Sequence, residues 1–471
     1  MKTKFWKIPS SYKNHHRSAS LLELFFDILI VVLLGGAIHG WVHIFEEYNA
    51  HGEFSYKNAF YIFLQVVTVL FMWRNFMIYS TRYDSNNTRH RVFTMIIMLF
   101  VSFMDVSIYI VPHDEETKTA VTIIDSIGML VSLLLIAYMN LSASWKAENK
   151  YEKQFLKRTS FARVLSALLM VIGFTLYGTS SEDYVHWISL GIWSVNLVIW
   201  VTLDFLIYTK KYYANTELLN VHLIQERYSV LLIIFMGEMS IQAITNIAMH
   251  TDNLEEVLNG IKKLVITMVI IFAWWWFFKE FYNYPDIAHR SKKIMLYTYS
   301  MMGIFVSIMI SSTGISLILN KEGKLENIGK YTLAFGIFAW HIFEWTLSKI
   351  LLPFNKADKW ILPKVIIKAK KFSVLIFITL GTIVFIPGLT GFIWLVIVMS
   401  YSGGYIFFLE VWKYLIIKNK ERNEKEFEEY YQAYLVKEAE WIEKYVVKYL
   451  DKDLHAKAEY DLNIYSKLIK S

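Results

Sequence analysis

Apolar stretches of about 20 residues, repeated along most of the chain, constrain its fold more than any other feature. A stretch of this length spans the hydrocarbon core of a bilayer as an α-helix. Hydropathy predicts about twelve such spans, at 20–43, 58–79, 91–111, 119–141, 161–178, 185–208, 226–248, 261–281, 294–318, 330–351, 372–387 and 389–416. Charged residues gather between them, and 55% of the chain is hydrophobic. The sequence therefore predicts an all-α, polytopic integral membrane helical bundle, with the lipid bilayer as its solvent.

The distribution of charge divides the chain into five segments. Basic residues before the first span resemble the start of a signal peptide, but no small-residue cleavage site follows, so we expect a retained first helix. The expected segments are a cytoplasmic N-terminal segment at 1–19, a first transmembrane half at 20–208, a cytoplasmic linker at 209–225, a second transmembrane half at 226–416, and a cytoplasmic amphipathic helical tail at 417–471.

The connections between spans alternate in charge. Every second connection carries a cluster of Lys and Arg, as at 82–91, 146–158 and 290–293, whereas the intervening ones are mostly acidic, as at 46–53 and 114–116. Because basic connections stay in the cytoplasm, we expect a multi-pass protein of the cell membrane with both termini cytoplasmic.

The two halves resemble each other weakly, at an offset of about 200 residues. The parallels are Glu23-Leu-Phe with Glu226-Arg-Tyr, each followed by an apolar run that ends in glycine, and Phe71-Met-Trp73 with Phe272-Ala-Trp274. Six spans per half, related by an axis along the membrane normal, occur in several transporter folds whose site lies between the halves. Aromatic-rich spans also resemble each other by composition alone, so both explanations stay open.

Ionisable residues inside the predicted spans are the first candidates for a functional site, because they are costly in lipid. Glu23 and Asp27 are four residues apart and share one helix face, which should point at protein or water. Two clusters are expected, one per half: Glu23, Asp27, Arg74, Arg82 and Asp204 in the first, and Glu226, Arg227, Lys279, Glu280 and Glu410 in the second. Such pairs either serve function or fix the register of the helices.

Glu238 is the candidate nearest the middle of the bilayer. It lies roughly 18 Å along the helix beyond Glu226, and it follows Gly237, a residue that permits close approach. His341, Glu344 and Asp105 are also placed near the middle of their spans. Together these groups could pass a proton or hold a cation. The alternative is a protonated Glu238 bonded to one neighbour, and packing is the simpler explanation for Asp105, Asp125 and His341 taken singly.

Several function classes are disfavoured by what the sequence lacks. It has no cysteine, which removes disulfides and thiolate metal sites. It shows no phosphate loop, no zinc-binding His-Glu-x-x-His spacing and no nucleophile elbow. It also shows no basic domain outside the membrane that would bind nucleic acid. We therefore expect no catalytic residues, no metal, no cofactor and no nucleic-acid partner, although a membrane-embedded enzyme stays open.

Three motifs resemble those of a known family. They are Glu23-Leu-Phe-Phe-Asp27 in the first span, Tyr79-Ser-Thr-Arg82-Tyr83-Asp84 after the second, and Glu226-Arg-Tyr followed by Gly237-Glu238. With the order of the spans from about residue 15 to 416, they resemble the bacterial low temperature requirement protein A family. The resemblance implies a multi-pass bacterial membrane protein that supports growth in the cold, and it implies no particular substrate or reaction. The tail after residue 416 lies outside it.

These observations favour a protein that moves a small solute or ion, coupled to protons through Glu238, with Glu23 and Asp27 lining a cytoplasmic vestibule. The expected binding or transport residues are Glu23, Asp27, Arg74, Arg82, Asp84, Asp204, Glu226, Arg227, Glu238 and His341. The first alternative is a membrane-embedded enzyme or lipid-handling protein, with Glu23, Asp27 and Arg82 open to lipid headgroups. The second is a scaffold that holds a partner through its tail. The sequence leaves the solute and the oligomeric state open.

Overall fold

The computed structural model describes residues 19–83, 88–109, 115–147, 150–180, 182–207, 221–248, 254–282, 291–320, 324–350, 384 and 389–418. Within these ranges the chain is helical and has no strand. The helices are α1 (Leu21–His51), α2 (Tyr56–Tyr83), α3 (Thr88–Tyr109), α4 (Glu115–Ser144), α5 (Lys150–Thr179), α6 (Asp183–Ile207), α8 (Val221–Ala248), α9 (Leu254–Tyr282), α10 (Ser291–Asn320), α11 (Lys324–Ile350) and α13 (Gly391–Lys418).

Each of these helices coincides with one of the spans predicted from hydropathy. In the described part of the chain, nine are long and apolar enough to cross a membrane: α1 to α6, α8, α9 and α10. Helices α11 and α13 are not in this group. Within α13, the segment Gly391–Gly404 is apolar but shorter. The remaining predicted span, 372–387, is described only at residue 384, and the predicted tail lies outside the described residues beyond residue 418, so a total of about twelve spans stays a prediction.

Helix α1 shows how local chemistry sets the ends of these helices. Ser20 caps its first turn in a capping box, because the Ser20 hydroxyl accepts the amide hydrogen of Glu23 while the Glu23 side chain accepts that of Ser20. At the other end the chain leaves the helix at Gly52, whose φ of 78° is left-handed and favours glycine. The helix is therefore longer than its apolar stretch.

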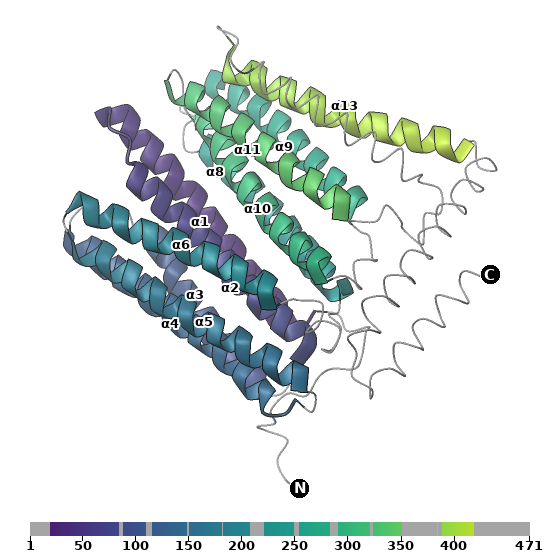
Figure 1. The fold of residues 1–471 in the computed structure, drawn as a ribbon. Coiled ribbons are helices and arrows are strands. Elements are labelled where there is room, and N and C mark those ends of the chain that lie inside the picture. Colours follow the sequence, from purple (N-terminus) through teal and green to yellow (C-terminus); the bar gives the residue numbers. More distant parts are fainter. Residues whose placement is uncertain are drawn as a thin grey trace.

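The helices pack as one bundle in which the first and second halves of the chain lie side by side (Figure 1). Helix α10 is almost wholly buried and contacts α1, α2, α6, α8, α9 and α11. Helix α1 contacts both α8 and α10, while α13 lies at the outer edge of the bundle, against α9 (Figure 1). The surface between the halves is therefore formed mainly by α1, α2, α8 and α10.

Glycines allow α10 and α11 to approach each other closely. A Cβ atom added at Gly314 would lie 2.8 Å from the carbonyl oxygen of Gly329, and one at Gly336 would lie 2.6 Å from the backbone nitrogen of Ser311. Side chains cannot occupy such positions without moving a backbone. Small residues at the contact are a common way for helices to pack in lipid, where no hydrophobic effect drives helices together.

Candidate functional site

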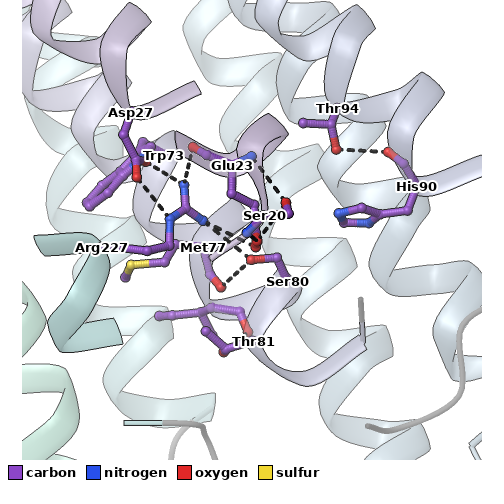
Figure 2. Close-up of polar contacts among 11 residues, drawn as sticks. Ser20, Glu23, Asp27, Trp73, Met77, Ser80, Thr81, His90, Thr94 and Arg227 are labelled. Atoms are coloured by element: carbon purple, nitrogen blue, oxygen red, sulfur yellow. Dashed lines mark hydrogen bonds and ion pairs between the residues drawn. The ribbon is translucent and has the colours of Figure 1, made fainter. Parts of the chain in front are cut away.

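Arg227 of α8 is the centre of a buried ion network between the two halves (Figure 2). Its Nη2 lies 2.5 Å from Oδ1 of Asp27, and its Nε donates to Oδ2 of the same carboxylate at 3.2 Å. The indole of Trp73 donates a further hydrogen bond of 2.7 Å to Asp27 Oδ1. Arg227 and Asp27 are both completely buried. This fork-to-carboxylate geometry is the strongest form of ion pair in proteins.

Glu23 joins the same network one helical turn earlier in α1. Its Oε2 accepts hydrogen bonds of 2.8 and 2.9 Å from the backbone nitrogen and hydroxyl of Ser20, while its Oε1 lies 3.7 Å from Nη1 of Arg227. Arg227 also donates to the backbone oxygen of Glu23 and to the Ser80 hydroxyl. The shared face of Glu23 and Asp27 therefore points at protein, as its spacing predicts.

A second buried network surrounds Asp204 of α6. Its Oδ2 accepts a hydrogen bond of 2.7 Å from Arg74 of α2 and one of 2.8 Å from Tyr299 of α10, and its Oδ1 pairs with Arg163 of α5. Arg74 also donates to the Thr298 hydroxyl at 2.7 Å. The guanidinium of Arg74 lies over the ring of Tyr299. This network ties α2, α5 and α6 of the first half to α10 of the second.

The two networks together balance their charges. They contain three arginines and three carboxylates, all at most 1% exposed: Arg74, Arg163, Arg227, Glu23, Asp27 and Asp204. Such compensation explains how six charged side chains remain inside an apolar bundle. The expectation of a separate cluster in each half was wrong, because Arg227 of the second half pairs with the first half. Lys279, Glu280 and Glu410 have side chains outside the described part of the structure.

Of three other predicted residues, two are buried or half-buried in the bundle and one lies outside the described structure. Arg82 is 2% exposed, and its guanidinium lies 4.8 Å from the centre of the Phe155 ring. Glu226 is half-buried, and its buried Oε2 has no hydrogen-bond partner in the described part of the chain. Asp84 lies outside the described residues. The burial of Glu23, Asp27 and Arg82 means that this cluster is not open to lipid headgroups.

Glu238 lies at the contact between α1 and α8. A Cβ atom added at Gly35 of α1 would be 2.9 Å from its Oε1, so the carboxylate rests directly on the α1 backbone. Gln242 donates hydrogen bonds of 3.2 Å to both Glu238 and the Gly35 oxygen. No described atom approaches Gly237, since a Cβ there would meet nothing within 4 Å; approach of a ligand to Gly237 stays a prediction. Gly35, on the other helix, provides the close approach.

His341 pairs with Glu344 within α11. No described contact joins His341 to Glu238. Its Nδ1 lies 2.9 Å from the Ile337 carbonyl oxygen, which can only accept, so Nδ1 carries the hydrogen. Its Nε2 lies 3.5 Å from Oε2 of Glu344. This second contact is attractive only when one of the two groups carries a further proton. Asp105, by contrast, lies in α3 near Asp125 of α4.

Sequence reasoning missed several members of the two networks. Arg163 lies inside the predicted span 161–178, so the rule that identified the other ionisable residues in spans also applied to it. Trp73, Thr298 and Tyr299 gave no comparable signal, because neutral polar and aromatic residues are frequent throughout this chain.

Long apolar helices joined by buried, charge-balanced networks define a polytopic helical membrane protein. Residues 18–401 match the family described as bacterial low temperature requirement A protein (LtrA). The chain therefore belongs to the LtrA family, as its three motifs indicate. No curated protein matches the chain, and no solved structure matches it either.

Proposed function

We propose that this protein transports a small solute or ion across the cell membrane and couples the movement to protons through Glu238. The observation that carries the proposal is the position of this glutamate, half-buried against Gly35 where α1 and α8 meet. Glu238 lies about 26 Å along α8 from its first residue, far from either end. An ionisable group at such a place is a candidate proton carrier, because lipid alone would not tolerate it.

We further propose that the bundle is a six-plus-six repeat. The contacts of α1 with α2 and α3, of α3 with α4 and of α2 with α6 have counterparts in the contacts of α8 with α9 and α10, of α10 with α11 and of α9 with α13. In this scheme α1 and α8 are equivalent helices, and Glu238 lies where they meet. Movement of one half against the other would then expose Glu238 alternately to each side.

The orientation and the physiological role complete the proposal. We propose that both termini are cytoplasmic, which the basic connections support, and the family's description favours a role at low temperature. The enzyme or lipid-handling alternative draws no support from Glu23, Asp27 and Arg82, which are buried in protein. The scaffold alternative depends on the tail, which lies outside the described residues.

The decisive experiment measures proton movement in liposomes that contain the purified full chain and a trapped pH-sensitive dye. A potassium diffusion potential drives protons inward through the wild type. Glu238→Gln should abolish this flux, because the amide has the same shape and cannot carry the proton. Glu182→Gln is the matched control, since Glu182 is exposed in the connection between α5 and α6 and its loss should leave the flux unchanged.

Two results would oppose the proposal. Equal flux in wild type and Glu238→Gln would remove Glu238 from proton coupling. Absence of flux in the wild type, together with altered lipid species in a deletion strain, would favour the lipid-handling alternative. Complementation of cold growth in the deletion strain by each variant, with membrane abundance checked by immunoblot, connects the flux to the physiological role.

A further inference from the structure

A third polar cluster lies between α2, α3 and α4, and none of the residues discussed for transport belongs to its core. Asp125 of α4 is completely buried. Its Oδ2 accepts a hydrogen bond of 2.5 Å from the Tyr61 hydroxyl, and its Oδ1 accepts one of 2.9 Å from Gln65 Nε2. Ser107 of α3 also donates to Asp125, and Gln65 donates to Ser107 at 3.1 Å. Asp105 lies beside this group and interacts electrostatically with Asp125.

This cluster lies toward the opposite end of the bundle from the arginine networks. Tyr61 and Gln65 are near the start of α2, whereas Arg74 and Arg82 are near its end. Gln65 and Arg74 are about 14 Å apart along the helix axis. The cluster also involves only the first half of the chain. It is therefore separate from the surface between the halves where Glu238 lies.

Two oxygen atoms in the cluster are buried and unsatisfied. Gln65 is 1% exposed and Asp105 is 5% exposed. Neither Gln65 Oε1 nor Asp105 Oδ1 has a hydrogen-bond partner in the described part of the chain. The Gln65 amide is held in the cluster by its two donated hydrogen bonds, which fixes the position of its oxygen. A buried acceptor without a partner costs about 1–3 kcal/mol, so a cation bound by these two oxygens would relieve that cost.

The charge of the cluster supports the same conclusion. Among the described residues, no Lys, Arg or His side chain forms an ion pair with Asp105 or Asp125. The other titratable groups facing the cluster are Tyr61 and, stacked on it at 4.7 Å, Tyr177 of α5. Three carboxylates in the arginine networks are each matched by an arginine, whereas these two are not. Either a proton or a bound cation is required to neutralise them in a membrane.

The helices around the cluster are closely packed, which favours a small ligand over a larger solute. A Cβ added at Gly128 of α4 would lie 2.8 Å from the Phe100 carbonyl oxygen of α3, so α3 and α4 are nearly in backbone contact. On the other side, Tyr61 packs edge-on against Trp193 of α6. The helices are therefore held close together by small residues and aromatic rings.

We propose that Asp105, Asp125 and Gln65 form a binding site for a small alkali cation, with Na⁺ as the reference ligand. Carboxylate, amide and hydroxyl oxygens are the ligands that hard cations prefer. The described residues contain no group of three or more His, Cys, Asp or Glu that could hold a metal ion, which argues against a transition metal. Ca²⁺ takes six to eight oxygens, and Asp125 already accepts three hydrogen bonds.

The inference does not rest on the proposed function, because it involves neither Glu238 nor transport. It is tested on the purified full chain in detergent, by thermal unfolding followed through tryptophan fluorescence. NaCl replaces choline chloride at constant ionic strength. We expect the Tm of the wild type to rise and saturate with Na⁺, because a ligand that binds only the folded state stabilises it.

Substitutions show which residues the Na⁺-dependent rise in Tm depends on. Asp105→Asn should raise the half-saturating Na⁺ concentration by about tenfold or more, which corresponds to about 1.4 kcal/mol. Asp183→Asn is the matched control, because Asp183 is an exposed carboxylate that pairs with Lys57 near the same end of the bundle, and its Na⁺ response should equal that of the wild type. Glu238→Gln should also respond normally, which separates this site from the proposed transport residue.

Equilibrium binding of radioactive ²²Na⁺ to the wild type provides a measurement that depends on no variant. Saturable binding that unlabelled Na⁺ displaces is the expected result. A wild-type Tm that is the same in Na⁺, Li⁺, K⁺ and choline, with no saturable ²²Na⁺ binding, would overturn the proposal. A full Na⁺ response in well-folded Asp105→Asn would overturn it as well; if that variant does not fold, Gln65→Leu takes its place.

Discussion

The ion pair between Asp27 and Arg227 should stabilise the bundle, and the effects of removing its two partners on the free energy of unfolding should be strongly coupled. Asp27→Asn preserves the shape of the side chain and removes its charge, which leaves Arg227 buried with Glu23 at 3.7 Å as its remaining partner. Removing one partner of a buried pair costs about 3–5 kcal/mol. Because Glu23 still compensates part of the charge, we expect about 3 kcal/mol, at the lower end of that range.

The reverse substitution should cost more. Arg227→Met leaves two buried carboxylates, Glu23 and Asp27, which are completely or almost completely shielded from solvent. We therefore expect about 5 kcal/mol, at the upper end of the range. The double variant removes both partners, so its loss should be about 5 to 6 kcal/mol, below the sum of the single losses by a coupling energy of about 2–3 kcal/mol.

The assay is reversible unfolding in mixed micelles of mild detergent and SDS, followed by tryptophan fluorescence and far-UV circular dichroism. The free energy of unfolding is obtained by linear extrapolation for the wild type, the single variants and the double variant. Glu47→Gln, near the exposed end of α1, is the control and should change stability by less than about 0.5 kcal/mol. Additive losses, within about 0.5 kcal/mol, would refute the reasoning.

Three further predictions follow from particular contacts. Gly35→Ala places a methyl group 2.9 Å from Glu238 Oε1 and should lower proton flux in liposomes about tenfold by displacing the carboxylate. The control is Gly237→Ala, whose methyl group meets nothing within 4 Å and should leave the flux unchanged. Equal fluxes in the two variants would contradict the prediction. Gly336→Ala pushes against the α10 backbone and should cost about 1–3 kcal/mol, seen as a lower Tm; an unchanged Tm would count against the close contact. Lys57→Ala removes an exposed ion pair and should cost less than about 1 kcal/mol, so a large drop in Tm would disprove its minor role.

Hydropathy predicted the positions of the helices better than their ends. Helix α5 begins at Lys150, although its apolar stretch begins near 161. The added turns are rich in Lys, Glu and Gln, which favour helix without favouring lipid. Hydropathy reports where a segment can be buried in lipid, whereas the helix continues until a cap such as Gly52 ends it. The two boundaries coincide only where polarity and capping change together.

Partners across the bundle could not be predicted in the same way. The sequence identified Arg227 and Asp27 as costly residues in spans, yet it gave no sign that they pair across 200 residues of chain. Local spacing determines which residues share a face of one helix, and the contact between α1 and α8 depends on how all the helices pack. For the same reason Gly237 attracted attention beside Glu238, although Gly35 on the neighbouring helix makes the contact.

Charge balance distinguishes the roles of the buried polar groups in this bundle. The networks around Arg227 and Asp204, taken together, pair three arginines with three carboxylates, so their charges cancel without a ligand. The hydrogen bonds of Arg227 connect α8 to α1 and α2. Among the described residues, no basic side chain forms an ion pair with Asp105 or Asp125, and the Gln242 amide is the one hydrogen-bond donor to Glu238. A proton or a bound cation would neutralise these carboxylates in the membrane, and for that reason our two proposals concern them and not the arginine networks.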